Sequence, residues 1–380
     1  MRTDMNIKMV DLYGQYLGIR DEIDRAMAEV VESSSFIKGP AVEQLEAGLC
    51  SFLGVRHCIA CGSGTDALTL SMMAAGIGQG DEVIMPAFSF AAVAEAVALL
   101  GARPVFADVE ASTFNLDISS MERMISPRTK AVVPVHLFGQ PCDMEKIMDV
   151  AKRHGLIVIE DNAQSLGALC RFSDGSGRHA GSIGHLGCTS FFPSKVLGCF
   201  GDGGAVFTDD EHLASMVRSL ANHGQSIKYH HEHVGLNSRL DSLQAAVLNA
   251  KLPHLESWIT ARRQAAEYYS EGLRDLGQVC LPVVSPGGTH VWHQYTLRVP
   301  QECRDGLKEM LAGAGIPSMV YYPAPLYGQP AYRDLCSSDT LMENAGKLCG
   351  EVLSLPMHSE LSRAQQDEII GVIRRYFTEK

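Results

Sequence analysis

The sequence predicts an α/β protein with a mostly parallel central sheet, helices on both faces of that sheet, and a small C-terminal α/β domain. From about residue 40 to 250, short apolar runs alternate with segments of helical periodicity, which is typical of a sheet wrapped by helices. The apolar runs are almost uninterrupted, which indicates burial on both faces and therefore parallel pairing. After Pro282 the pattern changes to a few strands and helices, which indicates a second, smaller unit.

The individual elements follow from these runs. Strands are predicted at residues 83–85, 104–109, 131–137, 157–162, 188–192 and 205–208, with helices at 91–100, 119–125, 144–154 and 211–221. A long helix over 240–276, bent near Pro253, is expected to connect the domains. The small domain is predicted to hold strands at 294–299 and 318–322 and helices at 304–314 and 363–377. The glycine-rich and serine-rich stretch 171–187 is predicted to be a mobile surface loop. We expect a large domain over residues 1–255 and a small one over 256–380.

Composition narrows the class of protein. The chain has 380 residues, 46% of them hydrophobic, and a net charge of −12, so a nucleic-acid-binding surface is not expected. No stretch of about 18 apolar residues is present, and residues 1–11 lack the pattern of a secretory signal. We expect a cytoplasmic protein that binds neither nucleic acid nor membrane. The 11 cysteines are scattered through apolar runs, and the Cys58–Cys61 pair lacks a second half-site, so buried thiols are expected rather than a metal site.

A glycine-containing turn, Cys-Gly-Ser-Gly-Thr-Asp, opens a predicted helix at residues 61–66. Gly62 and Gly64 allow the backbone to approach a ligand, and the free N–H groups at a helix start favour a phosphate. The segment lacks the lysine of a P-loop and the spacing of a dinucleotide fingerprint, which disfavours ATP and NAD. An ordinary helix cap is the more frequent explanation of such a motif taken alone.

Two further motifs lie at strand ends. The apolar run 157–160 leads to Asp161, at the edge of the sheet where ligands gather, although this carboxylate could equally cap a following helix. The strand at 188–192 leads into a turn with Lys195, followed by Gly198, Gly201, Gly203 and Gly204. Among small and apolar residues this lysine would be partly desolvated, which lowers its pKa and suits a Schiff base. A surface lysine in a turn is the common alternative.

The motifs together resemble the fold-type I pyridoxal-phosphate enzymes, with their aspartate aminotransferase-like fold, and specifically the DegT/DnrJ/EryC1/StrS family of sugar aminotransferases. The resemblance extends over nearly the whole chain. It rests on five motifs in order: Gly-Thr-Asp-Ala at 64–67, Asp-Asn-Ala-Gln-Ser at 161–165, Ser-Phe-Phe-Pro-Ser-Lys at 190–195, Gly-Asp-Gly-Gly at 201–204 and Asn-Ser-Arg-Leu at 237–240.

The resemblance implies a role for each matching residue. Lys195 would carry pyridoxal 5′-phosphate as a Schiff base and shuttle a proton, and Asp161 would pair with the ring nitrogen. Gln164 would hydrogen-bond the 3-oxygen, and Phe88 would stack on the ring. The phosphate would be held by Gly64, Thr65, Ser190 and, from the partner subunit, Asn237. A homodimer is therefore expected. L-Glutamate would convert the cofactor to pyridoxamine 5′-phosphate, and the amine would then pass to a nucleotide-linked keto-sugar.

The segments 194–204 and 223–233 resemble the subgroup that aminates C3 of UDP-2-acetamido-2-deoxy-3-oxo-D-glucuronate for surface polysaccharide, such as lipopolysaccharide O-antigen. A uronate calls for a cation and hydroxyl donors. The candidates are Arg239 of the partner subunit, Tyr321 and Tyr322, with His223 and His231 lining a nucleotide pocket. Arg239 could instead pair with Asp241, and the subgroup's usual His-Tyr-Pro is Tyr-Tyr-Pro here. No cysteine or carboxylate pattern favours a metal site among the histidines.

Three alternatives stay open at this point. Another UDP-linked or dTDP-linked 3-keto or 4-keto sugar would be aminated by the same chemistry. The dehydratase branch of the family replaces the Schiff-base lysine with histidine, so Lys195 argues against it. A non-catalytic regulatory module that binds the cofactor need not keep the lysine, the ring-pairing aspartate and the ring-stacking phenylalanine together.

Overall fold

A seven-stranded sheet forms the centre of the molecule in the computed structural model, which describes residues 6–335 and 342–378. The strand order is β1-β9-β8-β5-β4-β2-β3. Their bounds are β1 His57–Cys61, β2 Glu82–Pro86, β3 Arg103–Ala107, β4 Thr129–Val132, β5 Ile157–Asp161, β8 Leu186–Ser190 and β9 Gly204–Thr208. All neighbouring pairs are parallel except the two that include β9. The predicted mostly parallel sheet is confirmed.

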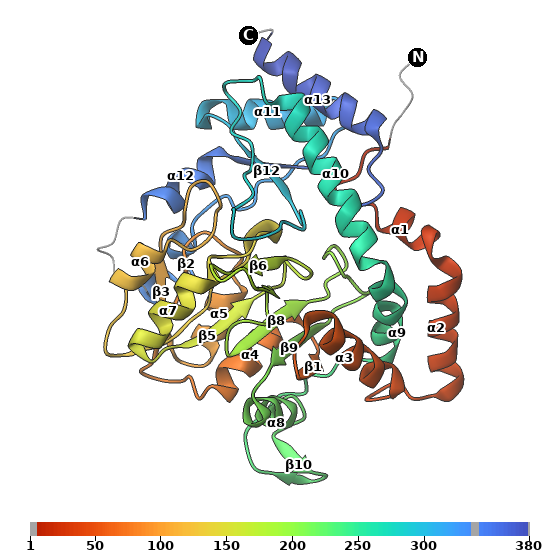
Figure 1. The fold of residues 1–380 in the computed structure, drawn as a ribbon, viewed down its shortest axis with the longest axis vertical. Coiled ribbons are helices and arrows are strands. Elements are labelled where there is room, and N and C mark those ends of the chain that lie inside the picture. The colour runs from red at the N-terminus through yellow and green to blue at the C-terminus, as the bar shows by residue number, and fades with distance from the viewer. Residues whose placement is uncertain (1–5, 336–341, 379–380) are drawn as a thin grey trace.

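Helices cover both faces of this sheet (Figure 1). The helices α4 (Gly64–Ala74), α5 (Ala92–Leu99) and α8 (Glu211–Leu220) share one core, and α3 (Pro40–Leu53), α6 (Ile118–Arg123), α7 (Met144–His154) and α9 (Ser242–Lys251) share the other. Successive side chains of a strand point to opposite faces, so Ile159 enters the first core and Val158 the second. The prediction of helices on both faces is confirmed.

Local sequence fixes where the helices begin and end. Asp143 caps α7 by accepting the N–H of Lys146 at 3.2 Å, and Gly155 ends it with a φ of 66°, where glycine is favoured. The N-terminal helices α1 (Leu12–Gly18) and α2 (Arg20–Ser33) lie beside α9, against which Ile23 packs on Val247. In the part of the chain that the structure describes, none of the helices is both long and apolar enough to cross a membrane.

Two hairpins depart from the predicted loops. The strands β6 (Leu169–Arg171) and β7 (Gly177–His179) pair within the stretch that was predicted as a mobile loop, and Ala180 and Ser182 beyond them are buried. Close packing requires glycine at position 187 of this stretch, because a Cβ on Gly187 would overlap the Gly181 carbonyl oxygen. The second hairpin, β10 (Gln225–Ile227) with β11 (His230–His231), projects beyond α8 (Figure 1).

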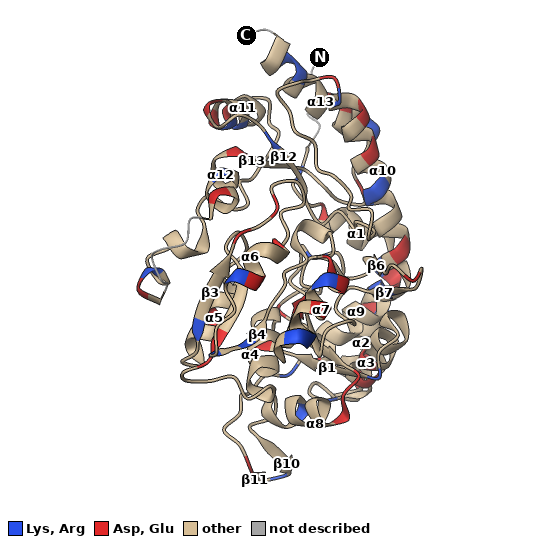
Figure 2. Cartoon of the chain, turned by 60° about the vertical axis from the view of Figure 1, so that its left-hand side comes forward, with Lys and Arg blue, Asp and Glu red and all other residues tan. Residues whose placement is uncertain are grey.

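The predicted long helix is α9 continued by α10 (Leu255–Leu273), with a 3-10 turn at Leu252–His254 that contains Pro253. The C-terminal part adds β12 (Tyr295–Arg298), α11 (Gln301–Gly313), α12 (Glu343–Glu351), β13 (Val352–Leu355) and α13 (Arg363–Thr378), all labelled in Figure 2. Charges of both signs are interspersed on α10 and α13 (Figure 2), and Arg374 pairs with Asp275 at 2.6 Å. The predicted strand at 318–322 is wrong, because only Met319 forms a bridge, to Ser354.

A third core belongs to this C-terminal part and includes Tyr269, Tyr295 and Ile373. The connecting helix α10 serves two cores, since Leu255 and Ile259 pack with the large sheet and the residues from Ala265 onward pack with the C-terminal elements. The division into 1–255 and 256–380 therefore stays a prediction, and residues 1–5, 336–341 and 379–380 of those ranges lie outside the described residues.

Candidate active site

The strands β5 and β8 end side by side, and a candidate residue lies at each end. Asp161 closes β5 and Ser190 closes β8, and the Asn162 N–H donates to the Cys188 carbonyl at 2.7 Å. The Asp161 carboxyl is buried, and its Oδ1 accepts the N–H of Ala163 at 3.0 Å. A turn rather than a helix follows, so Asp161 is not a helix cap.

Lys195 lies in the turn after β8, near enough to Asp161 for the charge of each residue to shift the pKa of the other. Its backbone N–H donates to the Phe192 carbonyl at 2.8 Å, and the residue is half-buried. Burial lowers the pKa of the Lys195 amine, and the Asp161 charge opposes that shift. Burial likewise raises the pKa of Asp161, and the Lys195 charge lowers it. The pair suits a nucleophilic amine beside a carboxylate that holds a cation.

The start of α4 lies against the end of β8, and we call Gly64, Thr65 and Ser190 at this junction the cradle. A Cβ on Gly64 would lie 2.6 Å from the Ser190 Cβ and 3.2 Å from its Oγ. Ser63 caps the helix by accepting the Asp66 N–H at 3.0 Å, while the N–H groups of Gly64 and Thr65 have no acceptor within the helix. A hydroxyl and free N–H groups meet there as a phosphate requires, so the residues fit the phosphate of pyridoxal 5′-phosphate.

Gln164 forms a side wall of the site together with Tyr322. Its Oε1 accepts the Phe138 N–H at 2.8 Å, and its Nε2 donates to the Tyr322 hydroxyl at 3.2 Å. One amide proton of Gln164 is then left for a ligand. Burial raises the pKa of Tyr322 and that of the half-buried Tyr321, so both keep their hydroxyl protons. The structure thus places Tyr322, predicted as a substrate residue, beside a cofactor residue of the same chain.

The predicted stacking role of Phe88 needs correction. Phe88 has no exposed surface, and its ring centroid lies 5.9 to 6.4 Å from those of Phe114, Phe138 and Tyr322. A ring enclosed on all sides offers no face to a ligand. Phe90, two residues on, is 58% exposed and lies 6.3 Å from Tyr322 between ring centroids. Phe88 is a core residue, and Phe90 is the aromatic side chain open to the site.

The candidates Asn237, Arg239, His223 and His231 form a separate group. Within the described residues, none of them hydrogen-bonds or pairs with Lys195, Asp161 or Gln164. Asn237 is exposed, and the neighbouring Ser238 points inward to Asp66 at 2.6 Å.

The two histidines of this group are exposed, and the His231 Nδ1 donates to the His223 carbonyl at 2.8 Å. Arg239 borders a cavity of about 220 Å³ with Lys38 and Arg218. Arg239 forms no ion pair among the described residues, and Asp241 caps α9 instead, so the pairing alternative for Arg239 is not seen.

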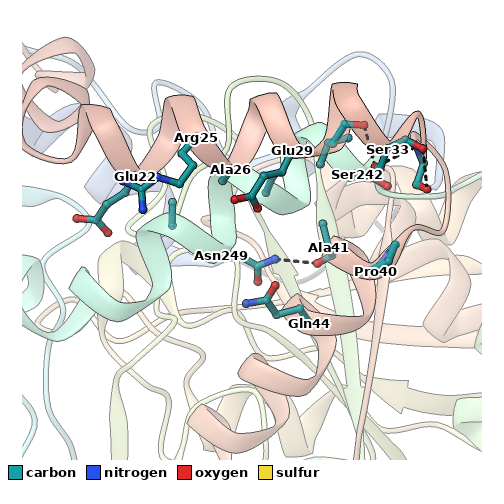
Figure 3. A pocket seen from close by; sticks show the side chains of 14 residues that line it. Glu22, Arg25, Ala26, Glu29, Ser33, Pro40, Ala41, Gln44, Ser242 and Asn249 are labelled. Atoms are coloured by element: carbon teal, nitrogen blue, oxygen red, sulfur yellow. Dashed lines mark hydrogen bonds between the residues drawn. The ribbon is translucent and has the colours of Figure 1, made fainter.

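A larger cavity, of about 470 Å³, lies between α2, α3 and α9 (Figure 3). Polar side chains such as Glu22, Arg25 and Gln44 line it, and Asn249 donates to the Ala41 carbonyl at 2.8 Å across its floor. No residue of the predicted site borders this cavity. The candidate residues at the strand ends are therefore separate from this larger cavity.

Comparison with known proteins decides the family. The model of the DegT/DnrJ/EryC1/StrS aminotransferase family matches residues 18–374. The chain belongs to this family. The aminotransferase is 44% identical over 358 residues to the UDP-2-acetamido-2-deoxy-3-oxo-D-glucuronate aminotransferase of Pseudomonas aeruginosa, which covers 94% of this chain and 97% of that one. It is 45% identical over 375 residues, 99% of each chain, to the UDP-N-acetyl-3-dehydro-alpha-D-glucosamine 3-aminotransferase of Acidithiobacillus ferrooxidans.

A solved structure agrees with this assignment. The crystal structure of DesV from S. venezuelae, in complex with a ketimine intermediate, is 40% identical, covers 98% of this chain and 99% of its own, and has a TM-score of 0.94. The predicted family and the fold-type I class are confirmed. The protein is an aminotransferase, and its cofactor is pyridoxal 5′-phosphate, the cofactor of this family.

The structure adds polar groups that the motifs did not indicate. Ser89 Oγ, Asn162 Nδ2 and His293 Nδ1 are buried without a hydrogen-bond partner in the described chain. Ser89 and Asn162 adjoin Phe90 and Asp161 in sequence, so their position was the available signal. His293 belongs to no motif, and it comes near Lys195 only in the folded chain. Burial lowers the pKa of His293, and the Lys195 charge lowers it further.

Proposed function

We propose that Lys195 carries pyridoxal 5′-phosphate and that the enzyme transfers the amino group of L-glutamate to C3 of UDP-2-acetamido-2-deoxy-3-oxo-D-glucuronate. The observation that carries the proposal is the pair formed by Lys195 and the buried Asp161 at the ends of β8 and β5. We further propose that the enzyme is cytoplasmic and serves surface polysaccharide biosynthesis, such as that of lipopolysaccharide O-antigen.

Each of the two paired residues has a defined task. The cofactor, when bound, supplies the electron sink of the reaction. Asp161 keeps the ring nitrogen protonated, because a buried carboxylate favours a positive charge beside it. Lys195 accepts and returns the proton of the substrate carbon, since a lowered pKa leaves more of its amine unprotonated near neutral pH.

The surrounding residues orient the ring and the phosphate. Gln164 is itself held by Phe138 and Tyr322, so its orientation is fixed, and its remaining amide proton would be donated to the 3-oxygen of the cofactor. Phe90, rather than Phe88, offers a ring face for stacking. Gly64, Thr65 and Ser190 would hold the phosphate of the cofactor, because free N–H groups and a hydroxyl meet there.

A homodimer completes the proposed site. Large apolar side chains are exposed on the N-terminal segment and on the Lys195 loop, namely Tyr13 (64%), Phe36 (43%), Ile37 (50%), Phe192 (52%) and Phe200 (43%). Tyr13 stacks on Tyr16, whose ring meets Phe200 edge-on at 6.0 Å, so part of this set is contiguous. Exposed apolar patches of this kind mark protein interfaces. A second copy that covers the patch can bring its exposed Asn237 to the phosphate of its partner.

The substrate assignment rests on Arg239 and on the relatives. Both relatives named above act, as their names state, on UDP-linked sugars with a keto group at C3. Arg239 has no ion pair within the described chain, which leaves its charge available for the carboxylate of a uronate. Tyr321 supplies a hydroxyl donor, and His223 and His231 line the nucleotide pocket. The second candidate is another UDP-linked or dTDP-linked keto-sugar without the carboxylate.

One experiment separates these substrates. The pyridoxamine form, prepared with L-glutamate and checked by release of 2-oxoglutarate, is mixed with UDP-3-keto, UDP-4-keto and dTDP-linked keto-sugars while its absorbance is followed. We expect the 3-keto uronate to react fastest, and Arg239→Leu to raise the KM for the uronate much more than that for the matching 3-keto glucosamine. Failure of every keto-sugar to react would refute the proposed function, and an equal KM change for both sugars would refute the role of Arg239.

A further inference from the structure

Lys251 is a buried cation at the C-terminal end of α9. Its side chain is among the most completely buried in the molecule, at 1% exposure, and it forms no ion pair among residues 6–335 and 342–378. Lysine is almost never fully buried without a charged partner, because removal of an ammonium group from water is costly. Burial accordingly lowers the pKa of Lys251 to about 8, although Cys199 and Glu360 raise it in part.

Lys251 makes a hydrogen bond and a cation–π contact with the glycine-rich loop that follows Lys195. The Lys251 Nζ donates to the Gly198 carbonyl at 2.7 Å and lies 4.8 Å from the centroid of the Phe200 ring. An ammonium group over an aromatic face is attracted by the ring, most strongly where water is excluded. The lysine therefore holds the loop at two points, one polar and one aromatic.

Gly198 is joined in turn to the Lys195 turn. A Cβ on Gly198 would overlap the Pro193 carbonyl oxygen, so this loop residue packs directly on the Phe192–Pro193 segment. The Phe192 carbonyl accepts the Lys195 N–H at 2.8 Å. A short series of contacts thus leads from the Lys251 ammonium to the backbone of Lys195.

The same face of α9 holds the loop at a second place. Gln244 lies seven residues before Lys251, which is two helical turns. Its Oε1 accepts the Phe200 N–H at 2.8 Å. Through the turn at Leu252–His254, α9 continues into α10 and the C-terminal elements. The helix that connects the two parts of the chain therefore also fixes the loop of the reactive lysine.

We infer that Lys251 is a positioning residue that holds the 198–200 segment, and through it the amine of Lys195, in the geometry that reacts with the cofactor aldehyde. The inference rests on the proposed role of Lys195. A misplacement of about 1 Å can cost about a hundredfold in rate, so the loss of both contacts of Lys251 has a measurable effect without any change in the residues that touch the cofactor.

The test compares Lys251→Met with Lys251→Arg and with a matched control, Lys130→Met. Lys130 also donates to a glycine carbonyl, that of Gly76 at 2.6 Å, but it is only half-buried, pairs with Asp81 at 3.5 Å and belongs to β4. Cofactor-free protein is mixed with pyridoxal 5′-phosphate, samples are reduced with borohydride at intervals, and the adduct at Lys195 is counted by peptide mass spectrometry. Acetylation of Lys195 by acetic anhydride in cofactor-free protein gives a second readout.

We expect Lys251→Met to slow covalent attachment at Lys195 about 10- to 100-fold and to change its acetylation rate, with circular dichroism unchanged. Lys251→Arg should restore the attachment rate to within a few fold, and Lys130→Met should leave it unchanged. A folded Lys251→Met protein that attaches the cofactor at the wild-type rate overturns the inference. The absence of an adduct on Lys195 in the unaltered protein would instead refute the proposed function.

If Lys251→Met fails to fold, Phe200→Leu tests the same contact from the other side. Removal of the aromatic face should slow attachment about two- to fivefold, and an unchanged rate would overturn the inference.

Discussion

Gly64→Ala tests the cradle between α4 and β8 most sharply. The added Cβ would lie 2.6 Å from the Ser190 Cβ, whereas carbon atoms rest about 3.5 to 4.0 Å apart. The shortfall is about 1 Å, and Ser190 cannot retreat freely because its strand pairs with β9 at Gly204. Overpacking of this kind costs about 1 to 3 kcal/mol. Relief of this overlap moves the Ser190 hydroxyl away from the N–H groups at the start of α4. The Kd for pyridoxal 5′-phosphate should therefore rise about 5- to 150-fold.

An absorbance titration of cofactor-free protein measures this change. The control is Gly313→Ala in α11, where nothing lies within 4 Å of the added Cβ. There the substitution should leave cofactor affinity unchanged and stabilise the fold by about 0.5 to 1 kcal/mol. If Gly64→Ala bound the cofactor with wild-type affinity, the cradle would not be the phosphate site.

Other predictions concern the charges around the site. Asp161→Asn keeps the shape of the side chain but removes its charge, so transamination measured by stopped-flow absorbance should fall about 100- to 10,000-fold, and a fall of less than tenfold would contradict the ring-nitrogen role. Burial of Lys195 should bring the pH midpoint for cofactor attachment below 10.5, the usual pKa of a lysine amine. Asp161→Asn should lower the midpoint further, because the aspartate charge raises the Lys195 pKa. An upward shift of the midpoint in this variant would contradict the electrostatic interaction between the two residues. Glu160 accepts the Gly181 N–H at 2.8 Å and the His136 ring N–H at 2.8 Å, and these partners outweigh burial and lower its pKa. The contribution of ionised Glu160 to the stability of the fold should therefore be present above about pH 4.5 and be lost as the pH falls further. Glu160→Gln should lower the free energy of unfolding by about 3 to 5 kcal/mol. Denaturant unfolding checks both predictions, and a change below about 1 kcal/mol would show that the Glu160–His136 pair does not stabilise the fold.

The motifs predicted the parts of the site that are local in sequence. Asp161, Ser190 and Lys195 follow directly from strand ends, and the start of α4 follows from glycines and a capping serine. These features depend on a few consecutive residues, whose backbone preferences are strong.

The sequence motifs could not predict which phenylalanine, Phe88 or Phe90, is open to the site. Phe88 and Phe90 are two residues apart in a Phe-Ser-Phe segment, and either could be buried. Their packing is decided by Phe138 and Tyr322, which come from distant segments of the chain. The choice between core and site is therefore a property of the tertiary structure.

The end of β4 shows the same limit on sequence patterns. The apolar run 131–137 predicts a strand, but the strand ends at Val132. Beyond it, the Leu137 N–H donates to the Asn115 side chain at 3.1 Å and the Phe138 N–H donates to Gln164 at 2.8 Å. The side chains of Asn115 and Gln164 thus accept backbone N–H groups that would otherwise pair with a neighbouring strand. The second of these bonds holds Phe138 next to Gln164.

Every role proposed for the site depends on covalent attachment of the cofactor to Lys195. Reduction of the cofactor-loaded protein with borohydride, followed by digestion and peptide mass spectrometry, tests it directly. We predict one pyridoxyl adduct, on the peptide that contains Lys195, and none after Lys195→Ala. An adduct on another lysine, or no adduct in protein that still transaminates, would contradict it.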